Sequence, residues 1–428
     1  MAEIQNKKSL IDAFKTGVIK ISGVASTFIL SVFLARTLEP ANYGQYSYIF
    51  SIIMLLTVPI QFGIPKLILR FVAEYKEKNE DYKIYELIAQ LHIILLITSI
   101  ITLVVFTFIS FGFENGKFTN WIIIANVFIY VLNVMYSSIL RGYGKVTSGN
   151  LSDLVIRPVL FIILILITSS LKMKYDVINV LILFLFSSLT SLLYVIWSCK
   201  LIILESLKSL KLLGVNWPYI KNLLSLLTPL FVVNAVDILN SNIDILFLGH
   251  YVGKSELGIY KVGLSLSWLF SLPRSIFTIA WAPHIASEYY NSKIRFQILV
   301  NRMSKLVFFT SIILFLMVLS FSQKFIFLLY GDSYCNSTFI LLILSAGHFL
   351  NISLGMGDVV LNMSGHDKDV AKYSFLAVTI NLILAFILIP KFGIYGAAIS
   401  TSVSMGVWNI FLFRSMKRLL SFYPNPLN

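Results

Sequence analysis

Residues 33–46 read FLARTLEPANYGQY and residues 247–260 read FLGHYVGKSELGIY, an offset of 214 positions in a chain of 428 residues. Phe, Leu, Gly and Tyr recur in register, and each stretch leads from one apolar run through a short polar segment into the next. A second, weaker pair relates Leu140–Lys145 (LRGYGK) to Leu361–His366 (LNMSGH). Together the pairs predict a duplicated chain with halves at 1–213 and 214–428.

The composition is that of a membrane protein. Hydrophobic residues make up 57% of the chain and charged residues 13%, against about 45–50% and about 25% in soluble domains. Runs of roughly 20 apolar residues, enough to span a bilayer, recur from end to end. We predict an all-α polytopic membrane protein with about 12 transmembrane helices in two pseudo-symmetric six-helix lobes, because lipid cannot satisfy an open backbone. The predicted spans are 14–33, 43–62, 86–110, 120–140, 151–169, 177–199, 222–249, 257–280, 303–321, 337–361, 371–389 and 394–413.

Most of the 34 Lys and Arg residues fall on one side of these spans. The positive-inside rule then places the N- and C-termini of this inner-membrane protein in the cytoplasm. The net charge of +14 is accounted for by loops beside anionic lipid, so no nucleic-acid partner is expected. Three longer amphipathic inside segments, 64–84, 201–221 and 283–302, are expected along the inner surface.

Enzyme chemistry has little support in the sequence. The five histidines lack metal-ligand spacing, and no phosphate-binding or nucleophile motif is present. Cys199 and Cys335 are expected near opposite membrane faces, where they cannot pair. We predict no catalytic residue, no metal site and no cofactor, so that transport would be driven by gradients, the membrane potential or product removal.

The seventh span carries a polar stripe. Asn234, Asp237, Asn240, Ser241 and Asp244 share one helix face, because residues three, four and seven apart align. A polar stripe is costly against lipid, so we favour a cavity-lining role over helix–helix hydrogen bonding. Asp237 is the deepest of these carboxylates, whereas Asp244 is expected nearer the outer surface.

Four cations are predicted inside spans: Lys20, Arg157, Lys261 and Arg274. The 214-residue offset superposes Lys20 on Asn234, which favours an inward-facing direction for Lys20. Lys261 and Arg274 lie roughly 140° apart at about 100° per residue, so only one of them can face a cavity centre. For each of these cations the alternative is snorkelling of the long side chain to the interface.

Two further spans carry polar faces. The fourth presents Asn126, Tyr130, Asn133 and Ser137, for which interhelical hydrogen bonding is the favoured interpretation. The tenth presents His348, Asn351, Gly355 and Asp358. His348 and Asp358 are the pair that could relay protons.

At this point a family resemblance can be stated. It is carried by FLARTLEPANYGQYSYIFSI from Phe33, Gly63, RFVA at 70–73, DILFLG at 244–249, GIY at 258–260, PHIA at 283–286, and LIP at 388–390 followed by GIYGAA at 393–398. In these segments, and in their order along nearly the whole chain, the protein resembles bacterial polysaccharide-unit flippases of the Wzx type. These belong to the multidrug/oligosaccharidyl-lipid/polysaccharide exporter superfamily. The motifs are loose and specify the family better than the substrate.

The resemblance implies two lobes that open alternately to the two sides. It implies transfer of an undecaprenyl-diphosphate-linked oligosaccharide from the cytoplasmic to the outer leaflet for surface polysaccharide such as O-antigen or capsule. Some family members couple transport to H⁺ or Na⁺. The implied partners are this lipid, membrane lipids, a polysaccharide polymerase and a chain-length regulator. The candidate roles are diphosphate binding by Lys20, Arg157, Arg274 and Lys261; sugar contact by Asn126, Asn133, Asn240, Trp268 and Asn351; and ion coupling by Asp237, Asp244, His348 and Asp358.

Three alternatives remain open. A drug/cation antiporter of the same superfamily would need a dominant acidic cavity, whereas the buried charges here are mixed. A membrane-embedded polysaccharide polymerase would favour a large external loop, and the longest one predicted, Ser322–Asn336, is short. A non-transporting scaffold is the third. Within the superfamily, about twelve spans favour a polysaccharide flippase over the lipid II flippases, which add a helix pair.

Overall fold

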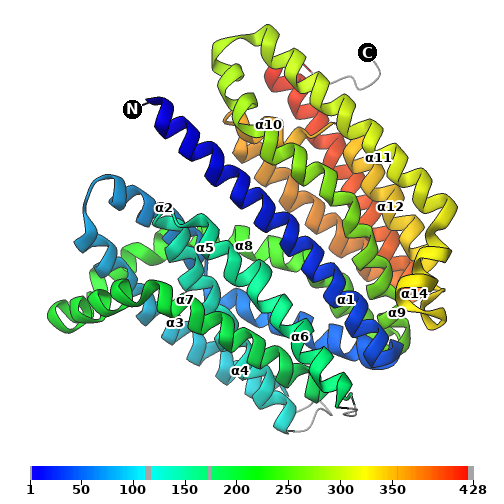
Figure 1. Cartoon of the computed structure of the whole chain (residues 1–428), viewed down its shortest axis with the longest axis horizontal. Helices are drawn as coiled ribbons and strands as arrows, with labels where there is room; N and C mark the ends of the chain where they lie inside the picture. The colour runs from blue at the N-terminus through cyan, green and yellow to red at the C-terminus, as the bar shows by residue number, and fades with distance from the viewer. Residues whose placement is uncertain (1, 111–116, 172–174, 354, 423–428) are drawn as a thin grey trace. The chain divides into compact units, whose positions relative to one another are not determined.

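The computed structural model describes residues 2–110, 117–171, 175–353 and 355–422, and within these ranges every regular element is a helix (Figure 1). In chain order the elements are α1 (Ala2–Gln61), α2 (Ile64–Glu77), α3 (Asp81–Ser110), α4 (Lys117–Gly142), α5 (Val146–Leu151), the π-helix η1 (Ser152–Ile156), α6 (Arg157–Ser170), α7 (Val177–Leu213), α8 (Trp217–Tyr251), α9 (Lys254–Ser267), the 3₁₀-helix η2 (Trp268–Phe270), α10 (Ser271–Asn291), α11 (Lys293–Tyr330), the 3₁₀-helix η3 (Asp332–Tyr334), α12 (Ser337–Ser353), α13 (Gly357–Met363) and α14 (Asp367–Leu420).

The helices reproduce the predicted spans. Across the described residues, nine helical segments are long and apolar enough to cross a membrane. Two of them contain a residue with non-helical backbone angles: Glu39 (φ 59°, ψ 168°) in α1 and Gly393 (φ 54°, ψ −130°) in α14. Each of these long elements therefore supplies two predicted spans, and the predicted span 257–280 falls on α9, η2 and α10. The predicted span 337–361 is not one continuous helix, because α12 ends at Ser353 and Gly355 (φ 83°) lies in the connection to α13. Gly355 therefore does not share a helix face with His348, contrary to the prediction from the sequence. The prediction of an all-α polytopic membrane protein is confirmed.

The chain forms two compact units that interleave in sequence. Unit 1 comprises Met1–Phe33 and Ile49–Leu239, and unit 2 comprises Leu34–Tyr48 and Asn240–Asn428. Each unit thus combines segments from both predicted halves. The division into lobes at 1–213 and 214–428 stays a prediction.

In unit 1, α7 is the central helix. It packs against α3, α4 and α6, and α4 also packs against α2 (Figure 1). The face of α7 toward these neighbours carries Ser187, Ser188 and Ser191, which are all fully buried. Small side chains let helix backbones approach closely where lipid gives no hydrophobic drive to associate. The serines therefore explain why α7 sits among several neighbours.

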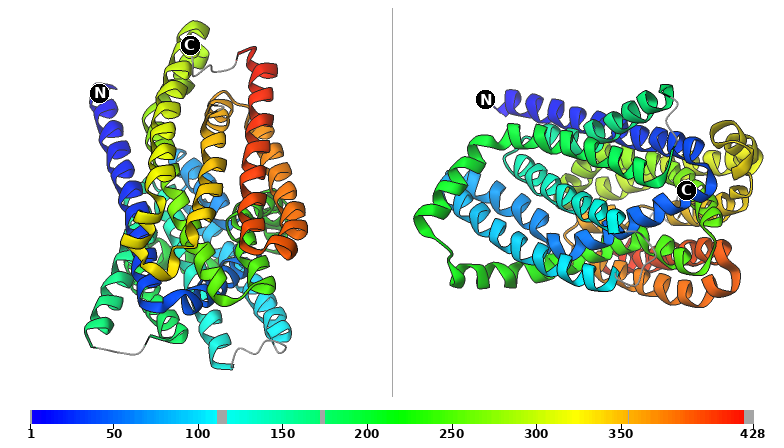
Figure 2. Two further views of the ribbon diagram at one scale, coloured as in Figure 1. Left: turned by 90° about the vertical axis from the view of Figure 1, so that its right-hand side faces the viewer. Right: turned by 90° about the horizontal axis from the view of Figure 1, so that it is seen from below.

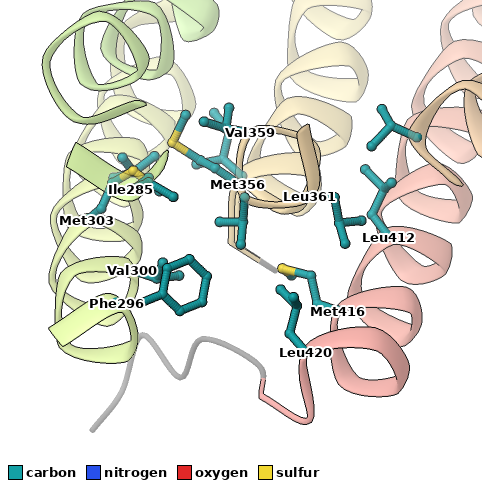
Figure 3. Packing of buried hydrophobic residues seen from close by; sticks show 14 residues of the cluster. Ile285, Phe296, Val300, Met303, Met356, Val359, Leu361, Leu412, Met416 and Leu420 are labelled. Atoms are coloured by element: carbon teal, nitrogen blue, oxygen red, sulfur yellow. The ribbon is translucent and has the colours of Figure 1, made fainter. Parts of the chain in front are cut away.

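In unit 2, α12 packs against α9, α11 and α14, and Figure 2 shows α11, α12 and α14 running alongside one another. At one end of this unit, apolar side chains from α10, α11, α13 and α14 form a buried cluster around Ile285, Met303, Val360 and Met416 (Figure 3). The α12–α13 connection also contributes Met356 to it. This cluster fixes the short helix α13, which carries Asp358.

The repeated motifs of the sequence meet inside unit 2. A Cβ placed on Gly44 would lie 1.9 Å from the carbonyl oxygen of Lys254, and a Cβ on Gly258 would lie 2.1 Å from that of Pro40. The offset of 214 relates Gly44 to Gly258 and Pro40 to Lys254, so the contact is reciprocal. Reciprocal contacts are typical of segments related by a two-fold axis. This geometry supports the duplication that the two motifs predict.

Candidate functional site

A proline shapes the first polar cluster, in unit 1. Pro158 has no backbone N–H, and it follows directly on the π-helix η1. In a π-helix the N–H of residue 158 would bond the carbonyl of residue 153. That carbonyl is left available, and Nη2 of Arg157 donates to it at 3.4 Å. The proline thus folds the Arg157 side chain back along its own helix, at a π-turn of the kind often found at functional sites.

The Arg157 guanidinium is held in place but not saturated. Its Cζ lies 4.8 Å from the centre of the Tyr130 ring and 6.0 Å from that of Phe184, which are cation–π distances. Nη1 is 4.0 Å from Oδ1 of Asp153, too long for a hydrogen bond. Within the part of the chain that the structure describes, Nη1 has no hydrogen-bond partner. Arg157 therefore keeps a donor for a further acceptor.

Asp153 lies between two arginines. Its Oδ2 is 4.0 Å from Nη1 of Arg141, and in the amide orientation that satisfies all neighbours, Asn133 Nδ2 donates to its Oδ1 at 2.8 Å. Arg141 is anchored in turn by Nη2, which donates to Ser138 Oγ at 2.7 Å. Two guanidinium groups and one carboxylate leave one positive charge in the cluster.

Lys20 belongs to the same unit. Three residues after it, Gly23 lies so close to η1 that an added Cβ would come within 2.6 Å of Leu154 Cβ. The helix bearing Lys20 therefore packs on the element that bears Asp153. The Lys20 side chain is exposed, so it adds positive charge on the accessible side of this helix pair.

The polar stripe of α8 contacts the turn between α1 and α2. Asp237 pairs with Lys66 at 2.8 Å, and Asn234 Nδ2 donates to Gln61 Oε1 at 3.3 Å. Both members of the ion pair are exposed, with 64% of the Asp237 side chain accessible. Asp237 is thus a carboxylate with a cationic partner, and an exposed pair of this kind contributes little stability. Its predicted role in ion coupling stays a prediction.

In unit 2, Arg274 is also neutralised by a carboxylate. Its Nη2 forms a short hydrogen-bonded ion pair with Asp358, and its Cζ lies 5.7 Å from the Trp408 ring. His348 is buried and stacks on Phe270 with ring centres 6.2 Å apart. Asp358 is therefore paired with Arg274, whereas His348 packs among aromatic rings.

A third polar cluster surrounds Asp244 in unit 2. Asp244 is 5% exposed, and its Oδ2 accepts hydrogen bonds from Tyr260 Oη, at 2.8 Å, and Thr401 Oγ1. Asn381 adds an amide interaction. Oδ1 has no partner among the described residues. Asp244 thus lies buried among hydroxyl and amide groups. Its predicted place nearer the outer surface of the membrane stays a prediction.

The remaining candidates divide by exposure. Asn126 and Asn133 are fully buried and bond to α7, and Asn351 bonds to Asn409, which fits the interhelical interpretation. Asn240 and Trp268 are exposed and stay candidates for sugar contact. Lys261 is half-buried on α9, and its role stays a prediction.

The sequence reasoning did not single out Arg141, Asp153, Tyr260, Asn381 or Thr401 as site residues. One signal was visible, since Asp153 and Arg157 have the i,i+4 spacing that brings an acid and a base together on a helix. The cluster around Asp244 had no such signal, because Thr401 is 157 positions away from it.

The family can now be stated. A family model described as polysaccharide biosynthesis protein matches residues 13–289, and one described as MatE matches residues 229–387. The chain belongs to the polysaccharide biosynthesis protein family. The first match contains the whole Arg141–Asp153–Arg157 cluster, and the second contains Asp244 and Asn381.

Similar proteins agree with this assignment. The capsular polysaccharide biosynthesis protein CapF of Staphylococcus aureus is 24% identical over 94% of this chain and 98% of its own length. A probable low-salt glycan biosynthesis flippase, Agl15 of Haloferax volcanii, is 24% identical over 92% of this chain and 80% of its length.

Solved structures show the fold. An inward-facing multidrug resistance MATE family transporter of the MOP superfamily has a TM-score of 0.72 at 14% identity, covering 95% of this chain and 98% of that one. The lipid II flippase MurJ has a TM-score of 0.70 at 19% identity, covering 95% and 87%. The relative Agl15 is named as a flippase, which agrees with the prediction that the chain is not an enzyme.

Proposed function

We propose that this protein flips an undecaprenyl-diphosphate-linked oligosaccharide from the cytoplasmic to the outer leaflet by alternating access, for assembly of a surface polysaccharide such as capsule or O-antigen. The observation that carries the proposal is the Arg141–Asp153–Arg157 cluster, in a family named for polysaccharide biosynthesis. A partly buried arginine with an unused donor is costly inside a membrane protein unless a ligand uses it.

The chemistry of the cluster suits a diphosphate. Arginine presents paired donors that match phosphate oxygens, and the ring of Tyr130 holds the Arg157 guanidinium in a fixed orientation. Lys20 would add charge on the exposed side. In unit 2 the cation Arg274 is already neutralised by Asp358. We therefore place the diphosphate on unit 1. Asn240 and Trp268, which are exposed, remain candidates for sugar contact.

Ion coupling is assigned to Asp244. Asp237 and Asp358 each have a basic partner, whereas Asp244 accepts hydrogen bonds from the hydroxyl groups of Tyr260 and Thr401. A buried carboxylate in such surroundings is stabilised by taking up a proton or a small cation. Binding of H⁺ or Na⁺ there, in one conformation more than in the other, would couple transport to a gradient.

The setting follows from the same proposal. The protein would lie in a bacterial inner membrane with both termini in the cytoplasm, as the basic inside segments indicate. The flipped lipid would pass to a polysaccharide polymerase and a chain-length regulator.

The test is reconstitution of the purified protein in liposomes. A defined undecaprenyl-diphosphate oligosaccharide is placed in one leaflet, and the fraction that becomes protected from an added glycosidase is followed over time. We expect protein-dependent protection that is accelerated by a pH or Na⁺ gradient. Asp244→Asn should remove the acceleration while keeping the gradient-independent rate. Empty liposomes and the exposed variant Arg302→Ala serve as controls.

A drug/cation antiporter is the second candidate, because the MatE match covers residues 229–387, which include Asp244. Gradient-driven efflux of organic cations from the same liposomes, with no movement of any lipid-linked oligosaccharide, would replace the flippase by the antiporter.

A further inference from the structure

The Asp153 carboxylate is the anionic group that faces Arg157, on the side where a bound phosphate would be expected. Its carboxylate oxygens are 4.0 Å from both Arg141 and Arg157. At this distance the charges attract, but no hydrogen bond forms. The Asn133 amide donates to Oδ1 of Asp153 at 2.8 Å, which is the same oxygen that faces Arg157. The carboxylate therefore balances one of the two positive charges without using up the donors of the arginines.

The surrounding backbone fixes this loose geometry. Pro158 leaves the Asp153 carbonyl available, and Arg157 Nη2 uses it, so the guanidinium points along the helix toward residue 153. The ring of Tyr130 covers one face of the guanidinium. Only 16% of the Arg157 side chain and 15% of the Asp153 side chain are exposed. In such surroundings a missing hydrogen bond is expensive, because water does not replace it freely.

A transporter has to release what it binds. Two arginines in a partly buried site would hold a diphosphate strongly through charge-assisted hydrogen bonds, and a substrate that is held equally well in every conformation is not moved. A carboxylate that competes for the same arginines lowers their affinity for the diphosphate. It also balances part of their charge after the diphosphate leaves.

We propose that Asp153 is a positioning residue that competes with the substrate diphosphate for Arg141 and Arg157, setting the affinity low enough for release. This inference rests on the proposed function. The diphosphate takes the donors of the arginines, Asp153 retains its bond to Asn133, and the arginines return to Asp153 after release.

The test measures initial flipping rates against the mole fraction of a polyprenyl-diphosphate-linked disaccharide in liposomes. Asp153→Asn removes the competing charge at the same size, so the half-saturating mole fraction should fall about tenfold and the maximal rate should also fall, because release becomes slow. Asp153→Glu extends the carboxylate toward the arginines and should raise the half-saturating mole fraction. Asp176→Asn removes an exposed carboxylate at the start of α7, where Asn can still cap the helix, and should change neither quantity.

The opposite signs separate this role from a structural one, since loss of folding would lower the rate in both variants without tightening binding. An Asp153→Asn variant with an unchanged or raised half-saturating mole fraction overturns the inference while wild-type flipping sustains the proposed function. No flipping by the wild type overturns both.

Discussion

The reciprocal glycine contact gives a quantitative prediction. In unit 2, Gly44 lies against the Lys254 carbonyl and Gly258 against the Pro40 carbonyl, where an added Cβ would come within 1.9 and 2.1 Å of an oxygen. Real Cβ atoms essentially never come closer than 3.0 Å, so the shortfall is about 1 Å in each case. Because the obstacle is backbone, no side-chain rotation can relieve it, and Gly258→Ala must push two helices apart.

The expected cost can be worked out from two opposing effects. Overpacking of a well-packed contact costs about 1–3 kcal/mol, while replacing a glycine inside a helix by alanine returns about 0.5–1 kcal/mol. The net destabilisation is then about 0–2.5 kcal/mol for either Gly44→Ala or Gly258→Ala. If unit 2 unfolds cooperatively, the melting temperature should fall by up to about 10 °C.

The assay is thermal unfolding of purified protein in detergent, followed by tryptophan fluorescence. Gly406→Ala is the matched control, because this glycine also lies inside a helix of unit 2 and an added Cβ there meets nothing within 4 Å. It should raise the melting temperature slightly. Since both motif glycines belong to one contact, the double variant should lose less than the sum of the single ones. Equal melting temperatures for Gly258→Ala and Gly406→Ala would refute the close reciprocal contact.

Two further predictions concern single side chains of unit 2. Arg36 caps the end of α11, because its Nε donates to the Leu329 carbonyl at 2.7 Å and its Nη2 donates to the Leu328 carbonyl. Arg36→Gln should lower the free energy of unfolding by about 1 kcal/mol, and Arg36→Lys should recover part of it. An unchanged melting temperature would contradict this capping role. Partial burial, with a hydrogen bond to Asp332 and its negative charge, raises the pKa of the Cys335 thiol, so less thiolate is present at a given pH and maleimide labelling should rise steeply only above about pH 8.5. Asp332→Asn should lower that pKa and speed labelling at pH 8, whereas buried Cys199 should label only after denaturation; the same rate with and without Asp332 would show that its charge does not act on the thiol.

The span pattern was predictable because lipid imposes it. Runs of apolar residues of bilayer length have to be helical, and the predicted ranges fall on helices except at the connection between α12 and α13, inside the range 337–361. The breaks were less visible, since Glu39 and Gly393 interrupt the backbone inside continuous helical segments. The alignment of the two repeats was also predictable from the sequence. Gly44 and Gly258 occupy equivalent positions, and the close backbone contact at each of them requires a glycine.

The charges were predictable but their partners were not. A sequence shows Arg274 and Asp237, but their partners Asp358 and Lys66 lie 84 and 171 positions away. Only tertiary packing determines which cation keeps an unused donor. The i,i+4 spacing of Asp153 and Arg157 is the exception, because it is visible in the sequence, although the sequence-based prediction did not use it.

Polar faces are ambiguous for a related reason. The fourth-span asparagines and the residues around Asp244 both produce a stripe at helical spacing, and the stripe is the same whether it lines a cavity or packs on a neighbour. Asn126 and Asn133 pack against α7, whereas Asp244 keeps an oxygen without a partner in the described chain. The identity of the neighbouring helix decides between these roles, and a single sequence does not contain it.

The most direct test of the central claim compares two lipids in the same liposome assay. One carries an oligosaccharide on undecaprenyl diphosphate, and the other carries the same oligosaccharide on undecaprenyl monophosphate. If Arg157 holds the diphosphate, wild-type protein should flip the first lipid faster, and Arg157→Gln should slow it by about tenfold or more while affecting the second much less. Equal flipping of the diphosphate lipid by wild type and Arg157→Gln, with both variants folded, would contradict the account.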